Sequence, residues 1–331
     1  MELSFQPVSD GITKTPTIFQ IVMTMSSLPS NKIQLARLGL SDLGKLSVLE
    51  LGTAERILVL APHPDDESLA AGGVIASLRQ VKPQSEIRVI IVTNGDASYT
   101  TSFFHSPHGF TTKHFQSIAL ERQQESLSAL MILGLAPSQI HFWGFPDQGL
   151  LQLRQKYWSR QESYRSPTTG FCCAEQAFNS LAFQYNGMNL LRLIQDQLMT
   201  FRPTMIIFPH PQDAHPDHKT LALLTVFATG IQYIRQTSPQ MLAYMIWSGN
   251  PLWMTGSFFN ENAKISFPKS ALPKEWKLFP LSKSVQQKKA VALTCYGSQN
   301  FATGQIVRAG TKNPQELFEL FAPIPSTPIA R

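Results

Sequence analysis

From residue 56 onwards, the chain alternates short apolar runs with longer helix-forming segments. The apolar runs are rich in branched side chains and are typical of strands buried on both faces. We predict strands over residues 56–61, 86–93, 139–143, 205–209 and 241–247. We predict helices over residues 68–80, 118–133, 189–200, 215–229 and 284–295. Strands that alternate with helices predict an α/β fold with a mostly parallel, doubly wound sheet flanked by helices.

Three segments do not follow this alternation. Residues 1–50 are polar and irregular, and we expect them to form a partly disordered N-terminal extension. Residues 152–187 are rich in Tyr, Ser and Arg, and we expect this insertion to shape the pocket. Residues 322–331 have the character of a loose C-terminal tail. The remaining pattern predicts a single domain over residues 51–321.

Polar residues follow the first and the fourth predicted strands. The sequence PHPDDE occupies residues 62–67, and DAHPDH occupies residues 213–218. Ligands of open parallel sheets bind beyond the carboxyl ends of the strands, so both loops lie where an active site is expected. Each loop alone could merely cap the helix that follows it, because Asp suits a helix N-terminus. The order His-Pro-Asp in both loops favours a shared chemical role.

These residue types suit a catalytic zinc site, in which three nitrogen or oxygen ligands leave a fourth position for water. His63 and Asp66 lie three residues apart on a tight turn, and His218 can complete the set. Asp65 adjoins a ligand and could take a proton from bound water, whose pKa zinc lowers towards about 7. His215 lies one helical turn before His218. As an imidazolium it could stabilise the oxyanion and then protonate the leaving amine.

The two loops resemble the signatures of the LmbE-like or PIG-L-type N-acetylglucosaminyl deacetylases. The first family signature is A-H-P-D-D-E, in which Pro62 replaces the alanine here, and the second is H-P-D-H. The resemblance extends over about residues 56–299 and implies a Rossmann-like fold and an N-acetylated amino sugar as the small-molecule substrate. It implies zinc ligands at His63, Asp66 and His218, a general base at Asp65, and an electrostatic or acid group at His215.

Weaker family elements imply substrate contacts. The sequence TNGD after the second strand, the R-x-x-E pattern of the next helix and GFPD after the third strand match that family. The resemblance therefore implies substrate-binding roles for Asn94, Asp96, Arg122 and Asp147. Without it, Arg122 could equally form an ion pair with Glu125 on the helix surface.

Two positions depart from the family pattern. The late element K-x-x-A-L-x-x-H-x-S-Q matches residues 289–299, except that Tyr296 replaces the usual histidine. Some members carry a tyrosine two residues before the H-P-D-H histidine, where Asp213 stands here. An oxyanion donor of that kind must therefore come from elsewhere, whereas the ligands and the base are retained.

Composition narrows the class of protein. Of 331 residues, 28 are Lys or Arg and 22 are Asp or Glu, which gives a net charge of +6. The basic residues are scattered, so we expect no nucleic-acid partner. No apolar run approaches the roughly 18 residues of a membrane helix, so we expect no membrane insertion. The 3 cysteines cannot form a disulfide framework, which favours a soluble, cytoplasmic protein. The oligomeric state stays open.

We therefore expect a zinc-dependent hydrolase that removes an N-acetyl group, with Fe²⁺ as the alternative metal. Two other functions stay open. Two histidines and one carboxylate also form the triad of iron(II) oxygenases, although those ligands normally lie on an antiparallel barrel. The second alternative is a catalytically inactive sugar-binding relative, which would require the loss of a ligand or of the base. A dinucleotide-binding protein is excluded, because PHPDD stands where a glycine-rich turn is needed.

Overall fold

The computed structural model describes residues 35–39, 47–52, 54–98, 111–159, 161, 163–174, 183–233, 238–247, 264–268, 276–299 and 315–321. The strands of the main sheet are β2 (Ser47–Val48), β3 (Arg56–Ala61), β4 (Glu86–Thr93), β5 (Ile140–Phe145), β6 (Met205–Pro209), β7 (Gln240–Tyr244), β9 (Trp276–Pro280) and β10 (Gln315–Phe321). Their spatial order is β2-β9-β10-β7-β6-β3-β4-β5. A separate sheet pairs β1 (Leu35–Gly39) antiparallel with β8 (Lys264–Pro268).

The centre of the main sheet is parallel. β3 lies between β4 and β6 and pairs parallel with both, and β5 and β7 extend this parallel part on either side. β10 is antiparallel to β7 and β9, whereas β2 is parallel to β9. The predicted α/β fold with a mostly parallel sheet is therefore confirmed.

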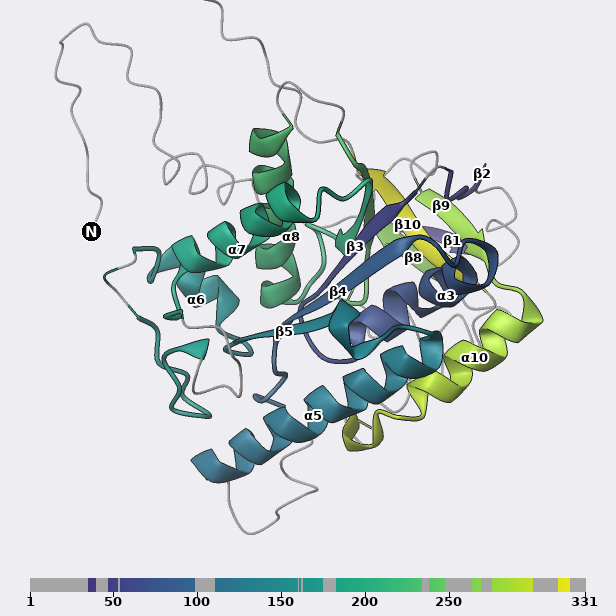
Figure 1. Cartoon of the computed structure of the whole chain (residues 1–331). Helices are drawn as coiled ribbons and strands as arrows, with labels where there is room; N and C mark the ends of the chain where they lie inside the picture. Colours follow the sequence, from purple (N-terminus) through teal and green to yellow (C-terminus); the bar gives the residue numbers. More distant parts are fainter. Residues whose placement is uncertain are drawn as a thin grey trace, which may run out of the picture. The chain divides into compact units, whose positions relative to one another are not determined.

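Helices cover both faces of this sheet (Figure 1). On one face lie α3 (Asp66–Val81), α5 (Thr112–Leu133) and α10 (Lys283–Leu293), which contact one another. On the other lie α6 (Leu150–Gln155), α7 (Gly187–Thr200) and α8 (Pro216–Gln232). Short 3₁₀ helices are η2 (Pro137–Gln139) and η4 (Gly297–Gln299). In the part of the chain described here, no helix is long and apolar enough to cross a membrane.

The central strands owe their continuous apolar runs to burial on both faces. Residues 57–61 of β3 and all residues of β6 are buried. A strand with one solvated face would alternate apolar and polar residues instead. The predicted bounds of β3, β4 and β6 therefore agree with the structure residue for residue.

The other seven predicted elements differ from the structure at one or both ends, and for two of them the physical cause is clear. α5 begins at Thr112 rather than at residue 118, because the Thr111 side chain accepts a hydrogen bond from the backbone N–H of His114 and caps the helix. β7 ends at Tyr244 rather than at residue 247. The backbone N–H groups of Ile246 and Trp247 donate to the Asp213 carboxylate instead of to a strand.

The predicted ends of the domain are only partly described. Residues 1–34 and 322–331 lie outside the described residues, so the predicted disorder and tail stay predictions. Residues 47–48, which fall within the predicted extension, form β2 and pair with β9 in the main sheet. The sheet thus takes in residues before position 51.

A buried ion pair joins α3 to α10 and β10. The Lys289 ammonium lies 2.6 Å from the Glu316 carboxylate and donates to the carbonyl of Leu69. The same carboxylate accepts hydrogen bonds from the backbone N–H groups of Gly73 and Val74, in the middle of α3. This close approach leaves no room for a side chain at residue 73, where an added Cβ would overlap the Leu281 methyl groups and lie 2.9 Å from Glu316 Cδ.

We predict that Gly73→Ala destabilises the protein by about 1–3 kcal/mol, because overpacking forces neighbouring side chains to move. Gly230→Ala in α8 is the matched control, since nothing lies within 4 Å of its added Cβ. It should be neutral or stabilise by up to about 1 kcal/mol, because alanine is the better helix former. Urea unfolding of both variants measures the difference, and equal free energies of unfolding would contradict this view of α3.

Candidate metal centre

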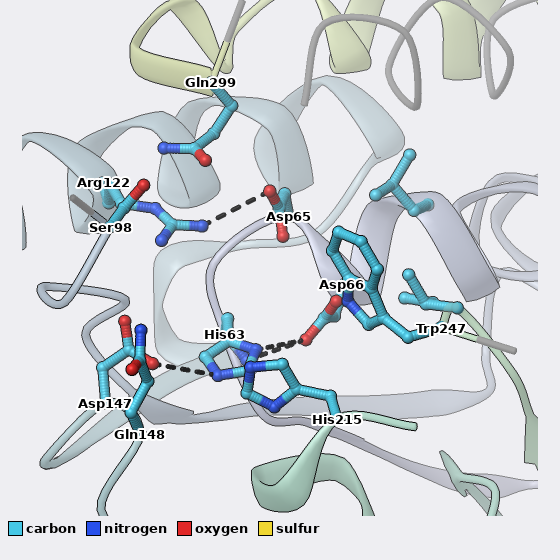
Figure 2. A pocket seen from close by; sticks show the side chains of 12 residues that line it. His63, Asp65, Asp66, Ser98, Arg122, Asp147, Gln148, His215, Trp247 and Gln299 are labelled. Carbon is cyan, nitrogen blue, oxygen red and sulfur yellow. Dashed lines mark hydrogen bonds and ion pairs between the residues drawn. The ribbon is translucent and has the colours of Figure 1, made fainter. Parts of the chain in front are cut away.

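The two His-Pro-Asp loops meet because the strands before them are neighbours. β3 and β6 pair in parallel, with Ile57 opposite Met205. The carboxyl ends of the two strands, and the loops that follow them, therefore lie at the same edge of the sheet. Asp66 begins α3, and His218 lies in the first turn of α8. Figure 2 shows the side chains of His63, Asp65 and Asp66 from the first loop and of His215 from the second around one pocket.

The three predicted ligands come together at this edge. Asp66 Oδ2 lies 3.1 Å from His63 Nδ1 and 3.1 Å from His218 Nε2, and the two ring nitrogens are 3.3 Å apart. A tetrahedral zinc with bonds of about 2.0–2.1 Å would separate its donor atoms by roughly 3.3 Å. All three side chains are buried. The donor set therefore fits a small divalent ion.

Carboxylates hold the outer nitrogen of each histidine. His63 Nε2 lies 3.1 Å from Asp147 Oδ1 and 3.3 Å from Asp217 Oδ2, and His218 Nδ1 lies 3.2 Å from Asp213 Oδ2. Such carboxylates orient a metal-binding imidazole and raise its basicity. This role of Asp213 and Asp217 was not predicted from the sequence. The available signal was an acid five residues before His218 and another directly before it.

Two other donor sets share His63. His215 has a donor atom within 4.8 Å of those of His63 and His218, and Asp147 and Asp217 form a second set with His63. We favour Asp66 as the third ligand because its oxygen touches both inner nitrogens, whereas His215 Nδ1 already accepts the backbone N–H of Asp217. Asp147 and Asp217 face the outer nitrogen of His63 and act as its hydrogen-bond acceptors.

The carboxylates around His63 and His218 favour the protonated, cationic form of both rings. Burial opposes protonation of His218, but Asp213 and Asp66 overcome this and raise its pKa to about 10. Burial likewise opposes protonation of His63, whose pKa is nonetheless raised by Asp147, Asp217 and Asp66. The two additional protons that make both rings cationic carry the same total charge as one divalent ion. Such an ion can therefore replace them without changing the net charge of the cluster.

Asp65 has an unusual backbone and no capping role for its side chain. Its φ is 114°, a strained value for a residue with a Cβ, and its carboxylate makes no capping hydrogen bond to α3. Instead, Asp65 Oδ2 lies 3.3 Å from Arg122 Nη2. Burial raises the pKa of Asp65 to about 8, against the opposing effect of Arg122. A nearby divalent cation would lower that pKa by favouring the carboxylate.

His215 is neutral at neutral pH. Burial, together with the positive charges of His63 and His218, lowers its pKa to about 4. His215 is also the N-cap of α8, and its Nδ1 accepts the backbone N–H of Asp217 at 3.2 Å. The ring proton therefore resides on Nε2. This differs from the expected imidazolium, because the sequence does not reveal two cationic rings beside His215.

The cavity in front of the ligands has a volume of about 140 Å³. Its lining comprises His63, Asp65, Asp66, Leu69, Ser98, Arg122, Asp147, Gln148, His215, Ile246, Trp247 and Gln299. Two predicted substrate contacts, Arg122 and Asp147, are among them. The other two, Asn94 and Asp96, are buried and do not line the cavity. The Asn94 side chain accepts a hydrogen bond from Gln123, and the Asp96 carboxylate accepts one from Thr168.

Arg122 joins the first loop to the loop after β4. Its Nη1 donates to the Gly95 carbonyl at 2.7 Å, and its Nη2 donates to the Pro64 carbonyl and lies near Asp65. Gly95 has a φ of 62°, a backbone conformation that favours glycine. An added Cβ would also overlap the Arg122 guanidinium, so both the backbone and the available space require glycine here. Arg122 does not pair with Glu125, which accepts two hydrogen bonds from Ser298 instead.

Solved structures share this fold at low sequence identity. The 4-carboxy-2-hydroxymuconate hydratase GalB from Pseudomonas putida KT2440 is 14% identical, covers 81% of this chain and 97% of its own, and has a TM-score of 0.51. The deacetylase Dbv21, which acts on the A40926 pseudoaglycone, is 15% identical over 82% of this chain and 98% of its own, with a TM-score of 0.50. The N,N'-diacetylchitobiose deacetylase from Pyrococcus horikoshii is 14% identical over 82% and 85%, with a TM-score of 0.48.

The comparison with curated proteins gave no match. A family match covers the region that carries both loops and the sheet edge between them. Residues 58–229 match the family described as PIG-L, GlcNAc-PI de-N-acetylase. This range holds every predicted ligand and both residues that were predicted to act on the substrate. The chain belongs to the PIG-L de-N-acetylase family.

Proposed function

We propose that this protein is a metal-dependent N-deacetylase that removes the acetyl group from an N-acetylglucosamine-type amino sugar. The observation that carries the proposal is the convergence of His63, Asp66 and His218 within 3.3 Å of one another. Asp65 and His215 line the same cavity, and the chain belongs to a family of de-N-acetylases. The substrate is a small molecule, and the cytoplasm remains our proposed location.

Zinc is the proposed metal, held by His63, Asp66 and His218. Two imidazole nitrogens and one carboxylate oxygen suit zinc and leave room for a further ligand. Fe²⁺ can use the same donors and stays the alternative. When bound, a divalent ion polarises the amide carbonyl and lowers the pKa of water. The parallel sheet supports a hydrolase over the oxygenase alternative.

Asp65 is the proposed proton carrier. It would take one proton from the attacking water and deliver it to the nitrogen of the breaking C–N bond. Water and the N-acetyl amine thereby become acetic acid and the free amine, with all protons accounted for. Arg122 stabilises the Asp65 carboxylate and fixes its direction. The leaving nitrogen therefore needs no proton from His215.

His215 would then act as a neutral hydrogen-bond donor. Its Nε2–H is left to donate because Nδ1 accepts the Asp217 N–H. A donor fixed before the reaction stabilises the negative charge that develops on the acetyl oxygen. This supplies the oxyanion donor that Asp213 cannot provide, since Asp213 is buried and engaged by His218 and backbone N–H groups.

The remaining lining would recognise the sugar. Trp247, which the sequence analysis did not single out, lies on the pocket wall in Figure 2 and offers a flat apolar face for a sugar ring. We keep Arg122 and Asp147 as proposed substrate contacts and assign Asn94 and Asp96 a supporting role. The insertion at residues 152–187 reaches this support through Thr168, whose hydroxyl donates to Asp96 at 2.9 Å. We keep a single domain as the proposal and extend it from residues 51–321 to include β2.

The first prediction concerns the metal. Protein purified without chelator should hold about one divalent ion per chain, and His63→Ala and His218→Ala should lose it. Binding must displace protons from rings whose pKa values are raised, so the affinity of metal-free protein should keep rising from about pH 6 to about pH 9. Calorimetry in buffers of different ionisation enthalpy should find about two protons released. Full occupancy in both variants, or an affinity that levels off near pH 7, would contradict the ligand set.

The second prediction concerns the reaction. A panel of N-acetyl amino sugars should include one from which the protein releases acetate and free amine without oxygen or 2-oxoglutarate. Asp65→Asn should keep the ion and the fold but lose about 10²–10⁴-fold in kcat, because an amide cannot carry the proton. Asp196→Asn, on the exposed side of α7, is the matched control. Near-normal turnover of Asp65→Asn would reject the base, and a need for either cosubstrate would favour the oxygenase.

The third prediction separates a neutral His215 from an imidazolium. The pKa of His215 is depressed, so the ring is neutral above about pH 4, and a divalent cation that replaces the two ring protons of His63 and His218 would keep this pKa low. His215→Ala should therefore reduce kcat by about 10²–10³-fold, by the same factor at every pH from about 5 to 9. Parallel pH–rate profiles are the expected result. A basic limb that disappears in the variant would show that the protonated ring is the active form.

A further inference from the structure

We infer that Tyr296 is a positioning residue of the active site, because its hydroxyl orients Glu67, which holds the backbone of Asp65. The inference rests on the proposed function in so far as Asp65 is the base. The chain of contacts is direct. Tyr296 OH donates to Glu67 Oε1 at 2.6 Å, and Glu67 Oε2 accepts the Asp65 backbone N–H at 3.1 Å.

Glu67 is a buried carboxylate whose contacts belong to the loop and not to the metal. It is 0% exposed, and its Oε1 accepts from Ser126 in α5 as well as from Tyr296. Each oxygen therefore has a defined direction: Oε1 faces two hydroxyl groups, and Oε2 faces Asp65. A carboxylate anchored at one oxygen can fix the group that is bound to the other.

Asp65 needs such an anchor because its backbone is strained. A φ of 114° costs free energy for a residue with a Cβ and persists only when neighbouring contacts enforce it. Two contacts act on this residue from opposite sides. Arg122 holds its carboxylate, and Glu67 holds its backbone N–H. Without the hydrogen bond from the Asp65 N–H to Glu67, the backbone would relax, and the Asp65 carboxylate would move away from the position in which it can accept the proton.

The Tyr296 hydroxyl also contacts Ser68, the residue that follows Glu67. Its oxygen lies 2.7 Å from Ser68 Oγ, and because its hydrogen goes to Glu67, Ser68 donates to it. The phenol thus connects two consecutive residues at the start of α3. It stands where the family usually has histidine, and η4 follows it directly, with Gln299 on the cavity wall. The position therefore couples the late segment of the chain to the Asp65 loop.

The alternative is that Tyr296 is only a packed core ring, since its side chain is 0% exposed. Tyr296→Phe separates the two roles, because it keeps the ring and removes the hydroxyl. Tyr244→Phe is the matched control: Tyr244 is also buried, and its hydroxyl donates to the Leu60 carbonyl at 2.9 Å. Tyr296→Phe loses the hydrogen bonds to Glu67 and from Ser68, whereas Tyr244→Phe loses one buried hydrogen bond and none to Glu67.

The first measurement is kinetic. Tyr296→Phe should lower kcat by about 10- to 100-fold, as expected for a displaced catalytic group, with KM within about twofold and metal content unchanged. Tyr244→Phe should leave kcat within about twofold. Glu67→Gln combined with Tyr296→Phe should be no slower than Glu67→Gln alone, because both changes break one chain of contacts. If Glu67→Gln does not fold, Ser126→Ala serves in the cycle, since Ser126 donates to the same oxygen.

The second measurement needs no substrate. Amide hydrogen exchange in residues 62–69 should be faster in Tyr296→Phe than in wild type and unchanged in Tyr244→Phe, at equal metal content. If this holds but the wild type releases no acetate, the positioning role stands and the proposed function fails. If the wild type is active, and Tyr296→Phe matches it in kcat and exchange, or the double variant loses the product of both factors, the positioning role is wrong.

Discussion

A group of buried carboxyl side chains beyond the ends of β3, β5 and β6 is the constraint that the surrounding structure has to meet. The carboxylates concerned are those of Asp65, Asp66, Glu67, Asp147, Asp213 and Asp217, and all six are buried. An uncompensated charge in such a place costs about 3–5 kcal/mol. Each carboxylate therefore faces a histidine ring, a guanidinium, a hydroxyl or a backbone N–H. The histidines that face two or more of them are the same residues that are placed to hold a cation.

Strand order and helix polarity make this arrangement possible. Because β3 and β6 are parallel neighbours, α3 and α8 both begin at the charged edge. Helix N-termini carry partial positive charge and free N–H groups, which stabilise acids in the first turn. Asp66 and Asp217 occupy such positions. The antiparallel strand β10 adds two more buried carboxylates, Glu316 and Glu319, which contact the Lys289 ammonium and the His210 ring.

The sequence predicted what depends on local pattern and missed what depends on tertiary contacts. β3, β4 and β6 were predictable because their apolar runs are continuous. β10 was missed because it carries Glu316 and Glu319, which are buried only because of their partners elsewhere in the chain. The convergence of the proposed ligands His63, Asp66 and His218 was predictable from residue type and spacing, and the structure brings their donor atoms within 3.3 Å of one another. The neutral state of His215 was not, because it depends on two charged rings that only the fold brings near.

The fold alone does not select the reaction, since a hydratase and deacetylases share it. Hydration and amide hydrolysis both require an activated water, so a metal and a placed base can serve either chemistry. What differs is where the electrophile sits and which oxygen gains charge. In this chain the neutral Nε2–H of His215 and the carboxylate of Asp65 flank the cavity, and each is fixed by its own hydrogen bonds. The backbone N–H of Asp65 is in turn held by Glu67, whose other oxygen accepts from Tyr296 and Ser126, so the position of this carboxylate depends on residues that do not line the cavity.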